Sequence, residues 1–232
     1  MLLSLGITDT LEGCTNYWGE DGFVAFKALE EKGLLTGNYH LTYRVNADNI
    51  NDGLKSALAV RERIGGGKNY HLDTIKGFVD GVMETQTRRL IEPYENMKHP
   101  ITGADYYGYV YDPCYTTEQV EELVTKANEA GFRTHFHTIG DAAVATAVDG
   151  IIAGQTSPKM RNAVTHLQLV PDGAIQKMAA NNIVAVTNPY WHYKEDGVWD
   201  DELKYFGEKV ELVSLINSLD PDALEMAKKE GS

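Results

Sequence analysis

The sequence predicts an α/β fold, an incomplete (β/α)8 barrel of the TIM type with about six parallel strands and surrounding helices. Strand-like and helix-like segments alternate six times at a spacing of roughly 30 residues, which is typical of βαβ units. Ionisable side chains recur at the ends of several predicted strands, as in barrels whose site lies at the carboxyl ends of the strands: Lys76, His137 and His166. A doubly wound dinucleotide-binding sheet is disfavoured, because no Gly-x-Gly-x-x-Gly follows the first strand.

Six short segments are rich in β-branched and aromatic residues or alternate apolar with polar ones, which predicts strands at 7–11, 40–45, 71–78, 133–141, 162–167 and 183–187. Helical periodicity predicts helices at 21–33, 51–64, 116–131 and 142–152, and another from 171 onward. Thr116 and Gln119 form a capping-box pattern, and Asp141 is expected to N-cap the helix after Gly140. Residues 200–232 are expected to form a helical tail, so that 1–232 makes a single partial barrel domain.

Residues 84–115 interrupt the alternation of predicted strands and helices. The segment is rich in Tyr, Pro and Gly and has no helical period, so it is expected to be a long inserted loop. Long aromatic loops in compact domains often cover a substrate, but a covering loop without a role in binding fits the composition equally well.

Two histidines mark the stretch 133–141. His135 and His137 are two residues apart on a predicted strand, so both imidazoles project from the same face. At the end of a strand that precedes a helix, an α/β enzyme places a metal ligand or an acid–base group. The alternative is one structural and one surface histidine. His135 lies deeper along the strand, which favours packing or support of a ligand over ligation.

Lys76 lies near the carboxyl end of the predicted strand 71–78, among apolar residues. Burial of an unpaired ammonium is costly. The side chain therefore either reaches solvent, pairs with a carboxylate, or is chemically modified and serves as a ligand. Asp80 is expected to be a turn residue, because Gly81 follows, or a partner of Lys76.

Composition narrows the function classes. The chain has 232 residues and a net charge of −13, which argues against non-specific binding to nucleic acid or to an anionic membrane surface. Two cysteines, Cys14 and Cys114, make no disulfide framework and fit a reducing, cytoplasmic compartment. No apolar run approaches the length of a membrane span. A small-molecule substrate remains the expected partner.

Four strings occur in an order and at a spacing that resemble the amidohydrolase superfamily, in the branch of N-substituted formamide deformylases and exoenzyme-regulatory-protein-like hydrolases. They are Ile75–Gly81 with Pro93-Tyr94 after it, His137–Asp141, Val164–Val170 and Asn188–His192. Each string alone is a weak signal, but the ordered set is fairly specific, and the resemblance extends over about residues 1 to 195.

This resemblance implies a metal-dependent hydrolase of amide-type C–N bonds, with one or two divalent ions, usually zinc, at the barrel mouth. By motif, Lys76, His137 and His166 match the metal ligands, and the lysine can be carbamylated in related enzymes. His192 matches a catalytic histidine that faces substrate, and Tyr94 and Trp191 match substrate-binding positions. His135, Asp80 and Asp141 would support the ligands, Asp141 by capping its helix or orienting His137. Imidazole and an anionic oxygen suit zinc, which acidifies its bound water.

The chain also departs from the family pattern. The His-x-His pair of the first barrel strand, the aspartate of the eighth and the flanking β-sandwich have no counterpart here. The resemblance therefore implies an internal piece of such a hydrolase, truncated and with little hydrolysis of its own.

Two other function classes stay open. An open sheet exposes edges and apolar faces, so the chain could be a non-catalytic assembly or binding module, including a homo-oligomer. The histidines could also act as general bases in an α/β enzyme without a metal.

Overall fold

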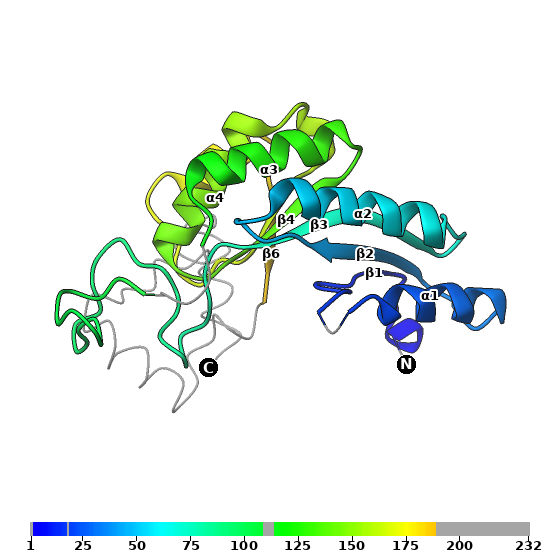
Figure 1. Ribbon diagram of the computed structural model, residues 1–232, viewed down its shortest axis with the longest axis horizontal. Helices are drawn as coiled ribbons and strands as arrows, with labels where there is room; N and C mark the ends of the chain where they lie inside the picture. The colour runs from blue at the N-terminus through cyan, green and yellow to red at the C-terminus, as the bar shows by residue number, and fades with distance from the viewer. Residues whose placement is uncertain (1, 18, 109–113, 189–232) are drawn as a thin grey trace, which may run out of the picture.

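The computed structural model describes residues 2–17, 19–108 and 114–188, and six parallel strands form its centre (Figure 1). The strands are β1 (Asp9–Leu11), β2 (Asn38–Arg44), β3 (Tyr70–Phe78), β4 (Arg133–Thr138), β5 (Ala163–His166) and β6 (Val184–Thr187). They pair in their sequence order, β1-β2-β3-β4-β5-β6, and every pairing is parallel. The sheet curls into half of a barrel, which confirms the predicted incomplete TIM-type fold.

Helices join the strands. They are α1 (Asp21–Glu31), α2 (Ile50–Ile64), α3 (Thr117–Glu129), α4 (Asp141–Gly154) and α5 (Ala174–Ala180), with 3-10 turns η1 (Leu2–Leu5) and η2 (Pro158–Met160). Figure 1 shows α2, α3 and α4 on the same side of the sheet. This single-sided cover follows from the sequential strand order, whereas a doubly wound sheet reverses its order and carries helices on both faces.

The main hydrophobic core lies between the sheet and these helices. Helix α3 begins as the sequence predicts, because Thr116 and Gln119 form both bonds of the capping box. Helical periodicity places four apolar residues on one side of α3, and all four are fully buried: Val120, Leu123, Val124 and Ala127. In α2 the same periodicity places Leu54, Ala57 and Leu58 on one side, but Leu58 is 39% exposed.

A β-bulge in β3 decides which way Lys76 points. The register of β2 against β3 advances from Leu41–Leu72 to Thr42–Thr74, so that Asp73 is an extra residue. Leu72 and Ile75 therefore both face the core, and Lys76 turns to the inner face of the curled sheet. Without the bulge, alternation would place Lys76 on the same face as Leu72.

The described part of the 84–115 loop has its own small apolar cluster, made of Leu90, Tyr94 and Tyr106 with Met97 and Leu169 against it. This segment lies between β3 and α3 in the chain. The predicted tail, 200–232, lies outside the described residues. In the part of the chain that the structure describes, no helix is long and apolar enough to cross a membrane.

Candidate functional site

The carboxyl ends of β3, β4 and β5 bring three of the predicted site residues to one end of the inner face. Lys76 is the register partner of His135, Phe78 that of His137, and Thr138 that of His166. Adjacent parallel strands thus place residues from distant parts of the chain beside one another, as expected for the carboxyl end of a barrel.

His137 is fixed by Asp80. Its Nδ1 donates to Asp80 Oδ1 at 3.0 Å, and the Asp80 side chain is fully buried. A carboxylate only accepts, so the proton of this hydrogen bond belongs to Nδ1, and Nε2 is the nitrogen left to bind a metal. Asp80 was expected to be a turn residue or a partner of Lys76, but its carboxylate holds His137, in keeping with its expected role of supporting a ligand residue.

His166 lies against His137. Their ring centroids are 4.7 Å apart at an interplanar angle of 66°. Nδ1 of His166 donates to Asn188 Oδ1 at 2.7 Å, which places the lone pair of this imidazole on Nε2. Burial, reinforced by the nearby His137, lowers the pKa of His166 to about 4. The ring is therefore neutral at pH 7, the form that binds metals.

The backbone of His166 is unusual for a strand end. Its φ is 77°, and that of the following Leu167 is 53°. Left-handed conformations are costly in residues other than glycine, and they concentrate at functional sites. The geometry turns the His166 side chain away from the regular alternation of β5.

Lys76 and His135 form a buried pair, at 3% and 5% exposure. Nζ of Lys76 lies 3.2 Å from Nδ1 of His135. Burial lowers the pKa of Lys76 to about 7 and that of His135 well below its usual value. The lysine thus neither reaches solvent nor, among the described residues, meets a carboxylate, and it acts as donor to an imidazole.

Asp141 does not cap its helix. Helix α4 begins at Asp141 itself, and the N-cap is Gly140, so the predicted N-cap was one residue late. Oδ1 of Asp141 accepts from the backbone N–H of Ile91 at 2.9 Å and of Ala142 at 2.9 Å. Its carboxylate therefore anchors the loop at Ile91, whereas His137 is held by Asp80.

Tyr94, expected to contact substrate, is 2% exposed. Its ring packs on Tyr106 at 5.4 Å, and its hydroxyl donates to the carbonyl of Arg88 at 3.2 Å. The structure gives this side chain a packing role within the loop. The other predicted substrate-contacting residues, Trp191 and His192, lie outside the described residues.

Two residues beside the site were not predicted from the sequence. Asn188 follows the end of β6 and holds His166; its position just after a strand end was a usable signal. Phe78 borders the site as well, with its ring 5.2 Å from that of His137 and Lys76 Nζ 5.0 Å from its centroid. Nothing in the sequence distinguishes Phe78 from an ordinary strand aromatic.

The imidazoles of His137 and His166 could supply part of the ligand set of a divalent ion. Two imidazoles adjoin, each with Nδ1 engaged in a hydrogen bond to an oxygen, and supporting hydrogen bonds of this kind are characteristic of metal-binding histidines. Within the described ranges, no group of three or more His, Cys, Asp or Glu side chains could hold a metal ion. A third ligand must come from Lys76 or from residues beyond those ranges.

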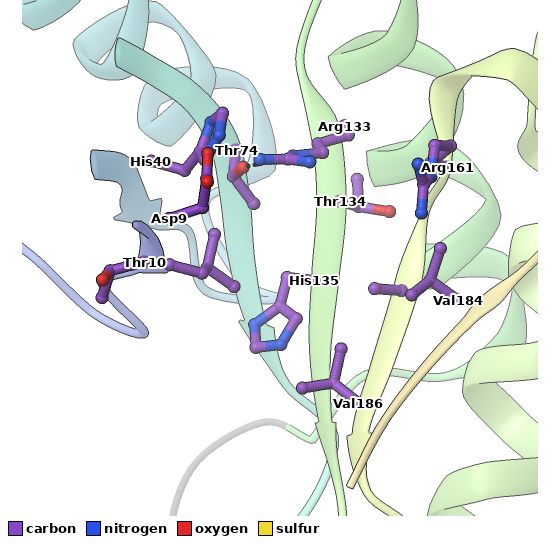
Figure 2. A pocket seen from close by; sticks show the side chains of 12 residues that line it. Asp9, Thr10, His40, Thr74, Arg133, Thr134, His135, Arg161, Val184 and Val186 are labelled. Carbon is purple, nitrogen blue, oxygen red and sulfur yellow. Dashed lines mark hydrogen bonds between the residues drawn. The ribbon is translucent and has the colours of Figure 1, made fainter. Parts of the chain in front are cut away.

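A cavity of about 220 Å³ occupies the other end of the inner face (Figure 2). His135 projects into it, whereas His137 and His166 do not line it. Its rim carries Asp9, Arg133 and Arg161, close to the amino ends of their strands. The cavity is therefore separate from the histidine pair.

The sequence is similar to a known protein family and to a curated protein. A sequence model of the amidohydrolase family matches residues 2–211. Over 171 residues the chain is 29% identical to the exoenzymes regulatory protein AepA of Pectobacterium carotovorum subsp. carotovorum, an alignment that covers 72% of this chain and 34% of that protein.

Solved structures share the fold. An uncharacterized metal-dependent hydrolase from Pyrococcus furiosus superimposes with a TM-score of 0.62 at 22% identity, over 90% of this chain and 39% of that one. A second, from Pyrococcus horikoshii OT3, gives a TM-score of 0.62 at 21% identity, over 90% of this chain and 38% of that one. The chain thus spans about a third of the length of the curated relative (34%) and under two fifths of these structures (39% and 38%).

Proposed function

Since the chain belongs to the amidohydrolase family, we propose that it supplies part of the active site of a hydrolase that cleaves amide-type C–N bonds with a metal-activated water. The observation that carries this proposal is the adjoining pair His137 and His166, 4.7 Å apart, with each Nδ1 tied to an oxygen acceptor. A general base needs no such partner ring, whereas an ion needs several lone pairs directed at one point.

In this proposal, His137 and His166 bind a divalent ion, for which zinc is the expected identity, and Lys76 completes the set. A bound ion of this kind acidifies a water molecule and polarises a carbonyl. Asp80 and Asn188 hold the two rings in the tautomer that ligation requires. His192 remains the predicted catalytic histidine facing a small-molecule substrate, and Trp191 a predicted contact with that substrate.

Lys76 suits this role because it can lose its proton. A pKa of about 7 leaves much of the amine neutral at physiological pH, and only the neutral amine can bind a metal or react to form an anionic carbamate. An ordinary surface lysine, with a pKa near 10.4, would not be available in this form.

The test is metal content per chain, by elemental analysis after purification without chelators. We expect near-stoichiometric zinc in the parent chain and its loss in His137→Ala and His166→Ala. His71→Ala, which removes a histidine from the opposite end of β3, serves as the matched control and should retain the metal. Equal metal content in all four proteins would contradict the site assignment.

A second candidate function, an assembly module, is favoured by one observation. Seven large apolar side chains with at least 40% exposure lie in the first 34 residues, around η1, β1 and α1: Leu3, Leu5, Ile7, Tyr17, Val24, Leu29 and Leu34. β1 pairs on one side only among the described strands, so this apolar group lies at a sheet edge. Light scattering on the parent and on Leu5→Glu/Leu34→Glu tests it: self-association that the double variant abolishes supports it, and a monomeric parent opposes it.

A further inference from the structure

The buried carboxylate of Asp80 contacts more than His137. The backbone N–H of Ile139 donates to both oxygens, at 3.1 Å to Oδ1 and 3.3 Å to Oδ2, and Oδ2 also accepts from the N–H of Gly140 at 2.8 Å. Oδ2 accepts in addition from the N–H of Arg89, in the inserted loop, at 3.2 Å. One carboxylate therefore joins a histidine ring, the β4–α4 turn and the loop.

The loop lies on the β4–α4 turn around this point. The N–H of Ala142 donates to the carbonyl of Arg89 at 3.2 Å, and the N–H of Ile91 donates to Asp141 at 2.9 Å. Arg89 also donates from Nη1 to the carbonyl of Tyr115 at 3.0 Å. The contact is close, because a Cβ added at Gly140 would overlap the carbonyl of Arg89.

We propose that Asp80 is a positioning residue that couples the loop segment 84–108 to His137. The loop and the imidazole share one acceptor group, so displacement of Arg89 changes the hydrogen bonds that fix the ring. In the hydrolase proposed above, on which this inference rests, the position of the loop would then set metal affinity at His137. A substrate that orders the loop would tighten the metal site.

Because His137 bonds to one oxygen of Asp80 and Arg89 to the other, an isosteric substitution can test the proposal. Asp80→Asn keeps one acceptor oxygen and replaces the other with a donor. The amide oxygen can face His137, or Gly140 and Arg89, but not both, whereas the N–H of Ile139 lies within hydrogen-bond distance of either position. It therefore breaks the link whichever way it turns.

Gly140→Ala disturbs the contact between the loop and the β4–α4 turn and leaves Asp80 in place. The φ of Gly140 is −81°, which any residue adopts, so the added methyl group strains the contact with Arg89 and not the local backbone. The three atoms nearest to the added Cβ all belong to the backbone of Arg89. Gly66→Ala is the matched control, since a Cβ there meets nothing within 4 Å.

Three readouts separate the possibilities: zinc affinity by chelator competition, the His137 tautomer in metal-free protein by long-range ¹⁵N–¹H NMR, and trypsin cleavage within 84–108. We expect the Nδ1–H tautomer in the parent chain. Asp80→Asn should weaken zinc roughly 10- to 100-fold. Gly140→Ala should increase cleavage, shift the His137 ring ¹⁵N resonances and weaken zinc roughly three- to tenfold. Gly66→Ala should match the parent.

Increased cleavage in Gly140→Ala with unchanged ring resonances would overturn the coupling, and so would an Nε2–H tautomer in the parent chain. A different result would contradict the proposed function. If the parent chain binds no zinc, the hydrolase proposal loses its support, while the ring resonances of metal-free Gly140→Ala still decide whether loop and imidazole are coupled. Should Asp80→Asn not fold, the Gly140→Ala results carry the test alone.

Discussion

Nζ of Lys76 donates to Nδ1 of His135 across the β3–β4 register, 3.2 Å away and out of contact with solvent. Neither partner supplies a negative charge. The described residues give Lys76 no carboxylate, so burial of its protonated form makes folding less favourable.

Stability of the metal-free protein should therefore rise with pH above neutrality. The pKa of Lys76 is about 7 in the folded chain, against 10.5 as its ordinary value. Between these limits the unfolded chain binds a proton that the folded chain does not, so the free energy of unfolding increases with pH, by roughly 1.4 kcal/mol per pH unit. The penalty is complete below pH 7 and absent above the unfolded pKa.

Urea unfolding of the parent chain and of Lys76→Met, both with a chelator present, measures the contribution of Lys76 to this pH dependence. The difference in unfolding free energy between the two should change in favour of the parent by about 2 kcal/mol from pH 7.5 to pH 9.5. Other groups that titrate in this range cancel in the difference. A constant difference would show that Lys76 keeps its proton in the folded protein.

The same pair should show strong non-additivity. Nε2 of His135 is buried and has no hydrogen-bond partner within the described residues, and an unsatisfied buried group costs about 1–3 kcal/mol. Lys76→Met/His135→Leu removes the ammonium and the unpaired nitrogen together. At pH 7 in chelator we expect this double variant to be more stable than the parent chain.

His135→Leu alone should be destabilising, because it leaves Lys76 without its acceptor. A double-mutant cycle from urea melts gives the interaction free energy, which we expect to be at least about 1 kcal/mol in magnitude. Simple addition of the two single effects would mean that the contact contributes nothing.

The fold followed from the sequence because its signals are local. Each βα unit carries its own periodicity, and capping residues such as Thr116 and Gln119 mark a helix start without reference to distant residues. Parallel pairing in sequence order then follows from the alternation of strand and helix. The bulge at Asp73 was not visible, because its cause is the fit of β3 to β2 and not the composition of either strand.

The site was less predictable. Lys76, His137 and His166 could be chosen from strand ends and family motifs, and the structure brings the two histidines together. The residues that hold these two histidines could not be predicted in this way. Asp80 holds His137 across 57 positions of sequence, and Asn188 holds His166 across 22, so only the register of β3 to β6 creates these contacts. The burial of Tyr94 could not be predicted either, because it depends on how the loop folds on itself.

Asn188 gives a prediction about the second histidine. Without the Oδ1 acceptor, Nδ1 of His166 no longer has a fixed proton, and the ring can adopt the other tautomer or rotate. Asn188→Ala should weaken zinc roughly tenfold in a chelator competition. The exposed Asn51→Ala on α2 should bind zinc like the parent chain. Unaltered affinity in Asn188→Ala, with loss of zinc in His166→Ala, would mean that Asn188 does not orient the ligand.

Gly77, between Lys76 and Phe78, should tolerate no side chain. A Cβ there would lie 2.6 Å from the ring of Phe136 and 3.4 Å from that of Tyr115. Both rings are buried, and the Tyr115 hydroxyl is fixed by a 2.6 Å hydrogen bond to the carbonyl of Val45, so neither can move freely. Gly77→Ala should therefore lower the free energy of unfolding by about 1–3 kcal/mol, the usual cost of overpacking.

Urea melts of Gly77→Ala, Phe136→Leu and the double variant identify the cause. Leucine vacates the space that the new methyl group needs, so the double variant should be more stable than the sum of the single effects predicts. Gly66→Ala, with open space around its Cβ, should change stability by no more than about 0.5 kcal/mol. If Gly77→Ala costs the same with Leu or Phe at position 136, the close approach of β3 to the Phe136 ring is not what requires glycine at this point of β3.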